Sequence, residues 1–218
     1  MCYPYVCDQQ PDFEVSITKQ DLIDELSYAS EEGKQYRLGY LETVAVYRKI
    51  SEKLIDYHAF MMHGAAIALN DAAYIFTGKS GTGKTTHIMK WLKNAPETIV
   101  INGDKPIIRY MDGSFFVCGT PWSGKEQMNT NTMIPLKKYI FMTRGEKNII
   151  TRIDYPQALP RMLGQIYLSK DVKKAQKTLD LLEHMKKDIQ FFDFYSDNLA
   201  EDSFQVSYHA IVEEEEPV

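Results

Sequence analysis

A run of residues in the first half of the chain matches a pattern that binds phosphate in many nucleotide-using proteins. It reads Gly-Lys-Ser-Gly-Thr-Gly-Lys-Thr over residues 78–85 and fits G-x-x-x-x-G-K-[ST] throughout. Glycines let successive backbone N–H groups point inward at an anion. Lys84 is expected to reach the β- and γ-phosphates, and the Thr85 hydroxyl to bind Mg²⁺. The predicted nucleotide-binding residues are Gly78, Lys79, Ser80, Gly81, Thr82, Gly83, Lys84, Thr85 and Thr86, with Lys79 and Thr82 acting through their backbone.

The flanks of this loop supply the structural context that the pattern requires. Residues 72–77 (AAYIFT) form a short apolar run typical of a strand, and residues 86–94 (THIMKWLKN) fit a helix. The apolar face of that helix comprises Ile88, Met89, Trp91 and Leu92. Such a helix directs the positive end of its dipole at bound phosphates. The alternative is a glycine-rich surface turn that fits the pattern by chance.

An acidic group must help to hold Mg²⁺ beside such a loop. Asp104 closes the first strand predicted after the loop helix, residues 97–102, and is the candidate. A plain turn aspartate in Asn-Gly-Asp is the alternative. The predicted metal ligands are therefore Thr85 and Asp104, and Asp104 is also a candidate for positioning an acceptor hydroxyl.

A histidine precedes the loop in an apolar run. His63 lies within residues 60–69, which Asn70 and Asp71 separate from the strand at 72–77. Asn-Asp between two apolar runs predicts a two-residue turn and an antiparallel hairpin. Because the start of one hairpin strand lies beside the end of the other, His63 is expected near the mouth of the loop. A neutral imidazole there could transfer a proton or orient a phosphate, and a satisfied core histidine is the alternative.

A polar loop after the predicted strand at 114–119 holds three more candidates. Lys125 could neutralise phosphate charge, Glu126 could accept a proton or bind metal, and Trp122 could stack on a base or close the pocket. An ordinary surface loop with a packed tryptophan is the alternative. Arg144, at the end of a further strand, is a candidate for phosphate contact or a surface residue. The predicted substrate contacts are Trp122, Lys125 and Arg144.

The rest of the chain alternates strand and helix patterns and ends in a helical part. Strand patterns cover residues 12–17, 60–69, 72–77, 97–102, 107–111, 114–119, 136–143, 148–153 and 189–195. The first predicted helix begins at a Thr18–Asp21 cap, runs through Leu22, Ile23, Leu26 and Ala29, and ends at Gly33. Further helices are expected over residues 40–57, 86–94 and 199–212. Two more are expected to begin after caps at Asp154 and Ser169. Residues 1–11 are expected to be irregular, and residues 213–216 to form a solvated acidic tail.

Composition narrows the class of protein. The 218 residues carry 44% apolar side chains and a net charge of −5, which suits one globular domain over residues 1–218 and argues against broad nucleic-acid binding. Cys2, Cys7 and Cys118 lack metal-type spacing and are interpreted as reduced thiols of a cytoplasmic protein. No signal peptide and no apolar run of membrane-spanning length are found. A homo-oligomer is compatible with the sequence.

These residues together resemble the catalytic domain of HPr kinase/phosphorylase. The likeness lies in a His-Gly pair on a strand, a hairpin, a Gly-x-Ser-Gly-x-Gly-Lys-Thr loop and a strand that ends in an acid, and it covers about residues 60–119. By position, Lys84 and Thr85 match the phosphate and Mg²⁺ groups. His63 and Asp104 match the histidine before the loop and the acid after the loop helix. More distantly, the loop is similar to that of ATP-dependent phosphoenolpyruvate carboxykinases. The resemblance implies an α/β fold with a mixed, largely antiparallel sheet.

The chain departs from that family at two places. The HPr enzymes end the strand in paired aspartates, whereas Gly103 precedes Asp104 here. One of the two carboxylate roles, general base and metal ligand, is thus unfilled or supplied elsewhere, with Glu126 as the candidate. The family's basic C-terminal segment is replaced by acid, which argues against HPr as the substrate. The stretch 119–126 looks like that of HPr-kinase-related bacterial proteins of unassigned role, some of which accompany peptide-modification systems.

Three functions fit this sequence. The first is a kinase that uses ATP, or another nucleoside triphosphate, and Mg²⁺ to phosphorylate a hydroxyl on a protein, peptide or small molecule. The second is a nucleotide-binding accessory or regulatory protein without efficient transfer, which the single aspartate favours and the intact Lys84 and Thr85 disfavour. The third is a carboxykinase-like metabolic enzyme, for which the chain is short and lacks an evident second metal cluster.

Overall fold

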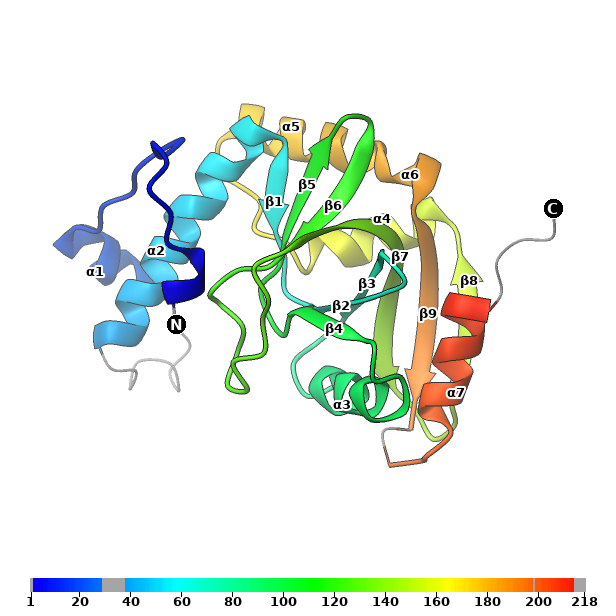
Figure 1. The fold of residues 1–218 in the computed structure, drawn as a ribbon. Helices are drawn as coiled ribbons and strands as arrows, with labels where there is room; N and C mark the ends of the chain where they lie inside the picture. The colour runs from blue at the N-terminus through cyan, green and yellow to red at the C-terminus, as the bar shows by residue number, and fades with distance from the viewer. Residues whose placement is uncertain (1, 29–37, 198, 214–218) are drawn as a thin grey trace.

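The computed structural model describes residues 2–28, 38–197 and 199–213 (Figure 1). Within these ranges the chain forms a mixed α/β structure around one nine-stranded sheet. The strands are β1 (Ala59–Met61), β2 (Ala65–Leu69), β3 (Ala72–Thr77), β4 (Ile99–Asn102), β5 (Ile107–Met111), β6 (Ser114–Cys118), β7 (Met133–Arg144), β8 (Ile149–Ile153) and β9 (Gln190–Ser196). The helices are α1 (Lys19–Tyr28), α2 (Leu38–Leu54), α3 (Lys84–Asn94), α4 (Tyr155–Leu163), α5 (Val172–Glu183), α6 (Met185–Asp188) and α7 (Ser203–Tyr208), with short helical turns η1 (Tyr3–Tyr5), η3 (Ile55–Tyr57) and η4 (His209–Glu213).

The sheet is mixed, as the sequence predicts. Its main path runs β1-β5-β6-β7-β3-β2-β4, while β9 pairs with β7 and β8 pairs with β9. The β3–β7 and β7–β9 pairs are parallel, and the other pairs are antiparallel. The long strand β7 joins the two parts of the sheet, because its first residues pair with β6 and its later residues with β3 and β9.

The predicted hairpin before the glycine loop is confirmed. Asn70 and Asp71 both have left-handed backbone angles, with φ of 52° and 59°, as a two-residue turn with a primed conformation requires. The register places Ala65 opposite Phe76, so the start of β2 lies beside the end of β3. Because β3 then has an antiparallel neighbour on one side and parallel β7 on the other, the sheet differs from a purely parallel one.

Helices cover both faces of the sheet (Figure 1). On one face, Met162 of α4, Leu182 of α5 and Met185 of α6 pack against the central strands and are almost fully buried. On the other face, Ile88 and Trp91 of α3 do the same. This burial of large apolar side chains from separate helices accounts for most of the stability of such a layered core.

Helix α1 does not bury the apolar face that its sequence pattern suggests. Its predicted cap is confirmed, since Thr18 N donates to Asp21 Oδ2 (2.6 Å) and Asp21 N donates to Thr18 Oγ1 (3.3 Å). Against α2, however, the helix places buried Glu25, which accepts two hydrogen bonds from Arg48. The side chains of Ile23 and Leu26 are left 58% and 40% exposed. The predicted Ala29 and Gly33 lie outside the described residues.

Four further predictions about elements need correction. Residues 12–17 form no strand, because Phe13 packs on Tyr57 (5.4 Å between ring centroids) instead of entering the sheet. The helix after α4 is capped by Asp171, whose carboxylate accepts from two backbone N–H groups, and not by Ser169. Met89 is 52% exposed and lies off the buried face of α3. The last helix, expected over 199–212, is confined to α7 and the turn η4.

Other predictions are confirmed at the level of the element. Residues 40–57 correspond to α2 and η3, and the Asp154 cap is a complete capping box with Gln157. Of the strand predicted over residues 97–102, residues 99–102 form β4. This strand lies at the end of the main path of the sheet, and its first residue, Ile99, is exposed. Residues 1–11 are irregular apart from η1, and residues 214–216 of the expected tail lie outside the described part of the chain. No helix in the described ranges combines the length and apolar character needed to cross a bilayer.

A buried histidine lies behind the glycine loop. His87 is fully buried on α3, and its ring lies 5.0 Å from that of Phe76 and 5.1 Å from that of Phe194. Its Nε2 atom lies 3.1 Å from both Trp91 Nε1 and Ser207 Oγ. Burial, with a smaller effect of Lys90, lowers the pKa of His87 to about 3.

In the unfolded chain, His87 binds a proton below the ordinary histidine pKa of about 6.5. In the folded protein it stays neutral down to a pH of about 3. We expect His87 to make the free energy of unfolding fall by up to about 1.4 kcal/mol per pH unit as the pH drops from about 6.5 toward 3. In His87→Gln this acid slope should be shallower, whatever the variant's stability at pH 7. Urea denaturation between pH 7 and pH 4 measures the slope, with His58→Asn as the control, because His58 is exposed and asparagine tolerates its left-handed backbone. Equal slopes in wild type and His87→Gln would contradict the assignment.

Candidate functional site

The glycine loop joins β3 to α3 in a conformation that requires glycine at position 78. Gly78 has φ of 147°, and a Cβ atom built on it would lie 2.4 Å from the Met142 carbonyl oxygen of β7. Lys84, the first residue of α3, donates from Nζ to the Gly78 oxygen (2.9 Å) and the Lys79 oxygen (3.2 Å). Burial lowers the pKa of Lys84. The lysine thus lies folded over its own loop, at the positive end of α3.

Beside this loop lies a cleft of about 490 Å³ that gathers residues from five separate segments. They come from the β1–β2 junction, the glycine loop with α3, the turn after β4, the β6–β7 loop (residues 119–132) and the end of β7. Its lining residues are His63, Ser80, Gly81, Gly83, Lys84, Thr85, Thr86, Gly103, Asp104, Gly124, Lys125, Glu126 and Arg144. Sheet topology explains this convergence, because the end of β3, the start of β2 and the end of β4 lie at the same edge.

His63 lies in the cleft but not within a strand. It occupies a break between β1 and β2, where its backbone N–H donates to the Gln165 carbonyl oxygen (2.7 Å). Its Nδ1 atom lies 3.2 Å from Gln165 Oε1, and its Nε2 atom lies 3.6 Å from Asp104 Oδ1. With the Gln165 amide in this orientation, a neutral imidazole donates from Nδ1 and leaves Nε2 as a proton acceptor facing the cleft.

Electrostatics keep His63 neutral near pH 7. Burial lowers its pKa most, and the positive charges of Lys105 and Lys84 lower it further. Asp104 and the contact with Gln165 act in the opposite direction and are outweighed. An uncharged imidazole beside the carboxylate is the form suited to accept a proton.

The turn after β4 is held by a buried amide. Asn102 is fully buried, and its Oδ1 atom accepts hydrogen bonds from the backbone N–H groups of Asp104 (2.9 Å) and Lys105 (2.7 Å). Its Nδ2 atom donates to the Thr120 carbonyl oxygen (2.9 Å). Gly64 N donates to the Asp104 carbonyl oxygen (2.9 Å), which ties the same turn to the start of β2. Since β2 lies between β3 and β4, the strand that Asp104 follows is not the immediate neighbour of β3, which leads into the glycine loop.

The backbone around Asp104 leaves no room for a second acid at position 103. A Cβ atom on Gly103 would lie 2.9 Å from the Ser123 carbonyl oxygen. A Cβ atom on Gly124 would lie 3.3 Å from Asp104 Cβ and 3.8 Å from Glu126 Oε2. The carboxylates of Asp104 and Glu126 therefore flank Gly124 in the same cleft.

The remaining predicted residues divide into two groups. Lys125 and Arg144 line the cleft with exposed side chains. Trp122 does not line it, because its ring meets Tyr47 edge-on (6.5 Å between centroids) and packs on the apolar cluster of Leu54, Ala59 and Met61. The prediction that Trp122 contacts substrate is therefore not supported by its position. Gly78, Lys79 and Thr82 are not among the lining residues, and Thr82 Oγ1 donates to the Lys79 carbonyl oxygen (3.0 Å).

Sequence reasoning missed three residues that shape the cleft. Lys105 donates from Nζ to Asp104 Oδ1 (3.0 Å), Asn102 holds the turn, and Gln165 sets the orientation of His63. The Asn-Gly-Asp-Lys-Pro sequence around Asp104 offered a signal for the first two. No local pattern marks Gln165, which lies just after α4 and reaches His63 across the fold.

Oxygen donors suitable for Mg²⁺ meet in the cleft, namely the Thr85 hydroxyl and the carboxylates of Asp104 and Glu126. In the described ranges, no group of three or more His, Cys, Asp or Glu side chains could hold a metal ion. Mg²⁺, however, usually binds through only one or two carboxylates, with water and substrate phosphates as its other ligands. The donors in the cleft fit Mg²⁺ in that way, together with a bound nucleotide.

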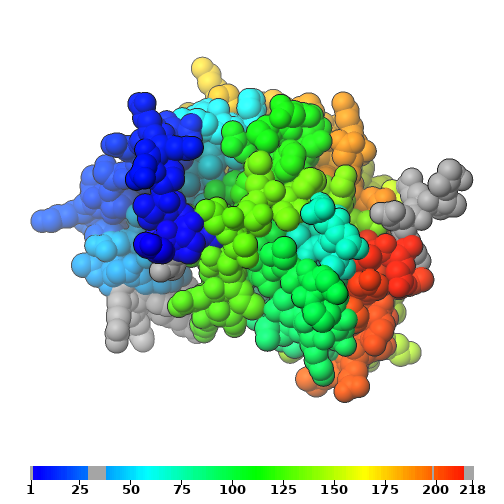
Figure 2. All heavy atoms as spheres, in the orientation of Figure 1, coloured from blue at the N-terminus to red at the C-terminus, as the bar shows by residue number. Residues whose placement is uncertain are grey.

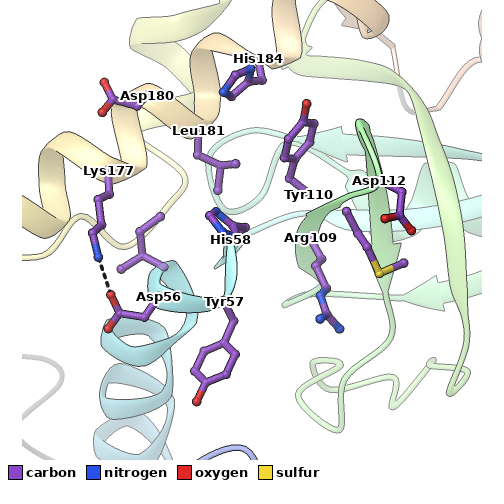
Figure 3. A pocket seen from close by; sticks show the side chains of 12 residues that line it. Asp56, Tyr57, His58, Arg109, Tyr110, Asp112, Lys177, Asp180, Leu181 and His184 are labelled. Atoms are coloured by element: carbon purple, nitrogen blue, oxygen red, sulfur yellow. Dashed lines mark hydrogen bonds and ion pairs between the residues drawn. The ribbon is translucent and has the colours of Figure 1, made fainter.

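A larger cavity, of about 600 Å³, lies at the other end of β1 and β5 and contains none of the predicted residues (Figure 3). Its wall includes Tyr110 stacked on His184 (5.1 Å, 12° between rings) and Lys177 paired with Asp56 (2.8 Å). The smaller cleft is the stronger candidate site, because, unlike the larger cavity, it joins the glycine loop to carboxylates and a neutral histidine.

Comparison with known proteins gives a distant likeness only. No protein-family description matches the sequence, and no curated protein matches it. Among solved structures, the chain is similar to the Hpr(Ser) kinase/phosphatase from Coxiella burnetii, with 9% sequence identity and a TM-score of 0.39 over 70% of this chain and 97% of that chain. A likeness of this size says nothing about the activity of this chain.

The charges around His63 predict two opposite changes in its pKa. Lys105→Met should raise the pKa, because it removes a positive charge that disfavours the imidazolium. Asp104→Asn should lower it, because it removes the carboxylate that favours the imidazolium. Histidine side-chain NMR titrations measure both changes, and the exposed His58 serves as an internal control in each spectrum. Shifts of the same sign in both variants would rule out this electrostatic arrangement.

Proposed function

We propose that this protein is a phosphotransferase that uses ATP and Mg²⁺ to phosphorylate a hydroxyl group on a protein, peptide or small molecule. The observation that carries the proposal is the meeting, in one cleft, of the glycine loop with Asp104 and the neutral His63. The elements described share one sheet, which supports a single catalytic domain.

The loop and α3 supply the phosphate site. Backbone N–H groups of residues 80–84 and the α3 dipole favour the negative charge of a nucleoside triphosphate. Lys84 Nζ already lies at the loop, where its contacts with the Gly78 and Lys79 oxygens would give way to phosphate oxygens. Thr85 and Asp104 would hold Mg²⁺, which neutralises the charge that develops on the transferring phosphoryl group. Lys125 and Arg144 add positive charge at the rim of the cleft.

Two groups would act on the acceptor. The bare Nε2 atom of His63 would accept or orient the hydroxyl proton as the hydroxyl oxygen attacks the γ-phosphorus and the nucleoside diphosphate leaves. Glu126 would supply the second carboxylate, because Gly103 has no space for one. The acceptor would thus approach between the β6–β7 loop and the β1–β2 junction.

A nucleotide-binding accessory or regulatory protein is the second candidate. The observation that favours it is Gly103, which leaves a single acid at the end of β4. The two candidates share the nucleotide site and differ in whether transfer occurs.

Nucleotide binding tests both candidates. We expect wild type to bind ATP with Mg²⁺ and Lys84→Ala to bind it at least tenfold more weakly, because a charge-assisted phosphate contact contributes about 1.5–3 kcal/mol. Titration calorimetry measures the affinities. Lys93→Ala, which removes an equal charge from the exposed side of α3, is the matched control and should bind as wild type does. Absence of binding in wild type would refute both functions.

Transfer separates the candidates. Asp104→Asn should retain ATP binding within about tenfold yet lose about 100-fold or more in transfer rate, because the lost charge acts mainly in the transition state. The measurement follows label from γ-³²P-ATP into proteins and peptides encoded beside the gene, with hydrolysis to phosphate as a second readout. Binding without transfer or hydrolysis in wild type would favour the accessory role.

A further inference from the structure

The segment of residues 2–17, here called the strap, crosses from the α1–α2 pair to the β6–β7 loop. At one end, Tyr57 Oη donates to the Asp12 carbonyl oxygen and Lys49 Nζ donates to the Ser16 carbonyl oxygen, both at 2.8 Å. At the other end, the strap lies against the loop that carries Lys125 and Glu126. The strap is dark blue and lies beside the green loop, as ribbons in Figure 1 and as spheres in Figure 2.

Two side chains of the loop hold the strap through specific hydrogen bonds. Tyr5 Oη donates to Asn129 Oδ1 (2.7 Å), and Asn131 Nδ2 donates to the Pro4 carbonyl oxygen (2.8 Å). The turn η1 presents both Pro4 and Tyr5, and burial raises the pKa of the Tyr5 hydroxyl, in keeping with its inward position. These bonds join residues more than a hundred positions apart in the sequence.

The contact continues from Asn129 toward the cleft. Asn129 Nδ2 donates to Ser123 Oγ (2.7 Å), and Ser123 is almost fully buried. The next residue, Gly124, packs beside Asp104 and Glu126. On the other side, the backbone of Asn129 forms an isolated antiparallel β-bridge with the backbone of Asn102. The side-chain amide of Asn102 holds the Asp104 turn. One asparagine therefore connects the strap to both carboxylate-bearing segments of the cleft.

We infer that the strap positions the β6–β7 loop, and that Tyr5 and Asn129 are positioning residues for Lys125 and Glu126. Backbone hydrogen bonds from Gly103 N to the Met128 oxygen (2.9 Å) and from Thr130 N to the Ile101 oxygen (3.1 Å) hold the later part of the loop, whereas the side chains of Lys125 and Glu126 at its tip are exposed. Ordering this tip before substrate arrives reduces the entropy that must be lost in the transition state. The part of this inference that concerns turnover rests on the proposed phosphotransferase function, whereas the part that concerns loop order does not.

The loop arm of the test uses Tyr5→Phe, which removes only the hydroxyl. Hydrogen exchange of amides 123–130 should become roughly fivefold faster, as expected for loss of one ordinary hydrogen bond. Asn131→Ala, which removes the contact with Pro4, should act in the same direction. Tyr3→Phe is the matched control, because Tyr3 lies in the same turn with 90% of its surface exposed. Acrylamide quenching of tryptophan fluorescence adds a second readout. Trp122 lies within the loop and reports its exposure, whereas Trp91 is fully buried. Unchanged exchange and quenching in Tyr5→Phe would overturn the inference.

The turnover arm compares affinity with rate. Tyr5→Phe should change the dissociation constant for Mg²⁺-ATP by less than twofold and lower the rate of Mg²⁺-ATP hydrolysis severalfold, a split that general destabilisation would not produce. Tyr3→Phe should leave both at wild-type values. A loosened loop with an unchanged rate would show that the strap does not position groups that act in turnover. If wild type binds no ATP, the proposed function fails, and the exchange measurement still decides whether the strap orders the loop.

Discussion

The candidate site depends on one buried amide, the side chain of Asn102. A buried amide that lost its partners would destabilise the fold by several kcal/mol, so its hydrogen bonds are a strong constraint on the surrounding backbone. Here the carbonyl end holds the turn of Asp104 and Lys105, and the amino end holds the β6–β7 loop at Thr120. The two carboxylate-bearing segments of the cleft are thereby joined through the same side chain. Close packing at Gly103 reinforces this junction and fixes which position can bear an acid.

The sheet brings the other half of the cleft to the same place. Because β2 is antiparallel to both β3 and β4, its first residues lie beside the last residues of both strands. The glycine loop, the histidine and the aspartate thus meet at one edge although each follows a different element. A larger cavity at the opposite end of β1 and β5 shows that volume alone does not identify the site. What distinguishes the smaller cleft is its chemistry, in which charged side chains, a neutral histidine and the glycine loop lie together.

Local patterns predicted most of this arrangement, and non-local packing decided the rest. The Asn70-Asp71 turn and the glycine loop have backbone requirements that few residues satisfy, so the sequence placed them correctly. The same hairpin predicted that His63 and the loop would meet. The role predicted for Trp122 stays a prediction, because an aromatic residue in a loop fits both a ligand contact and the contact with Tyr47 that the structure shows. Residues 12–17 alternate like a strand, yet Phe13 packs on Tyr57 and the segment is not assigned to a strand. Gln165 could not be found, because its role exists only after distant segments fold together.

The parallel pairing of β3 with β7 has a consequence for how the molecule assembles. The β2–β3 and β5–β6 hairpins close over two-residue turns, whereas β3 meets β7, and β7 meets β9, only after dozens of intervening residues have been brought into place. Closing long loops costs chain entropy before any contact compensates for it, so pairings of this kind form late in folding. Met142 of β7 presents the carbonyl oxygen that packs against Gly78, so the final shape of the glycine loop awaits that late step. A nascent chain that has synthesised the entire glycine loop but not β7 therefore still lacks the wall against which the loop is formed.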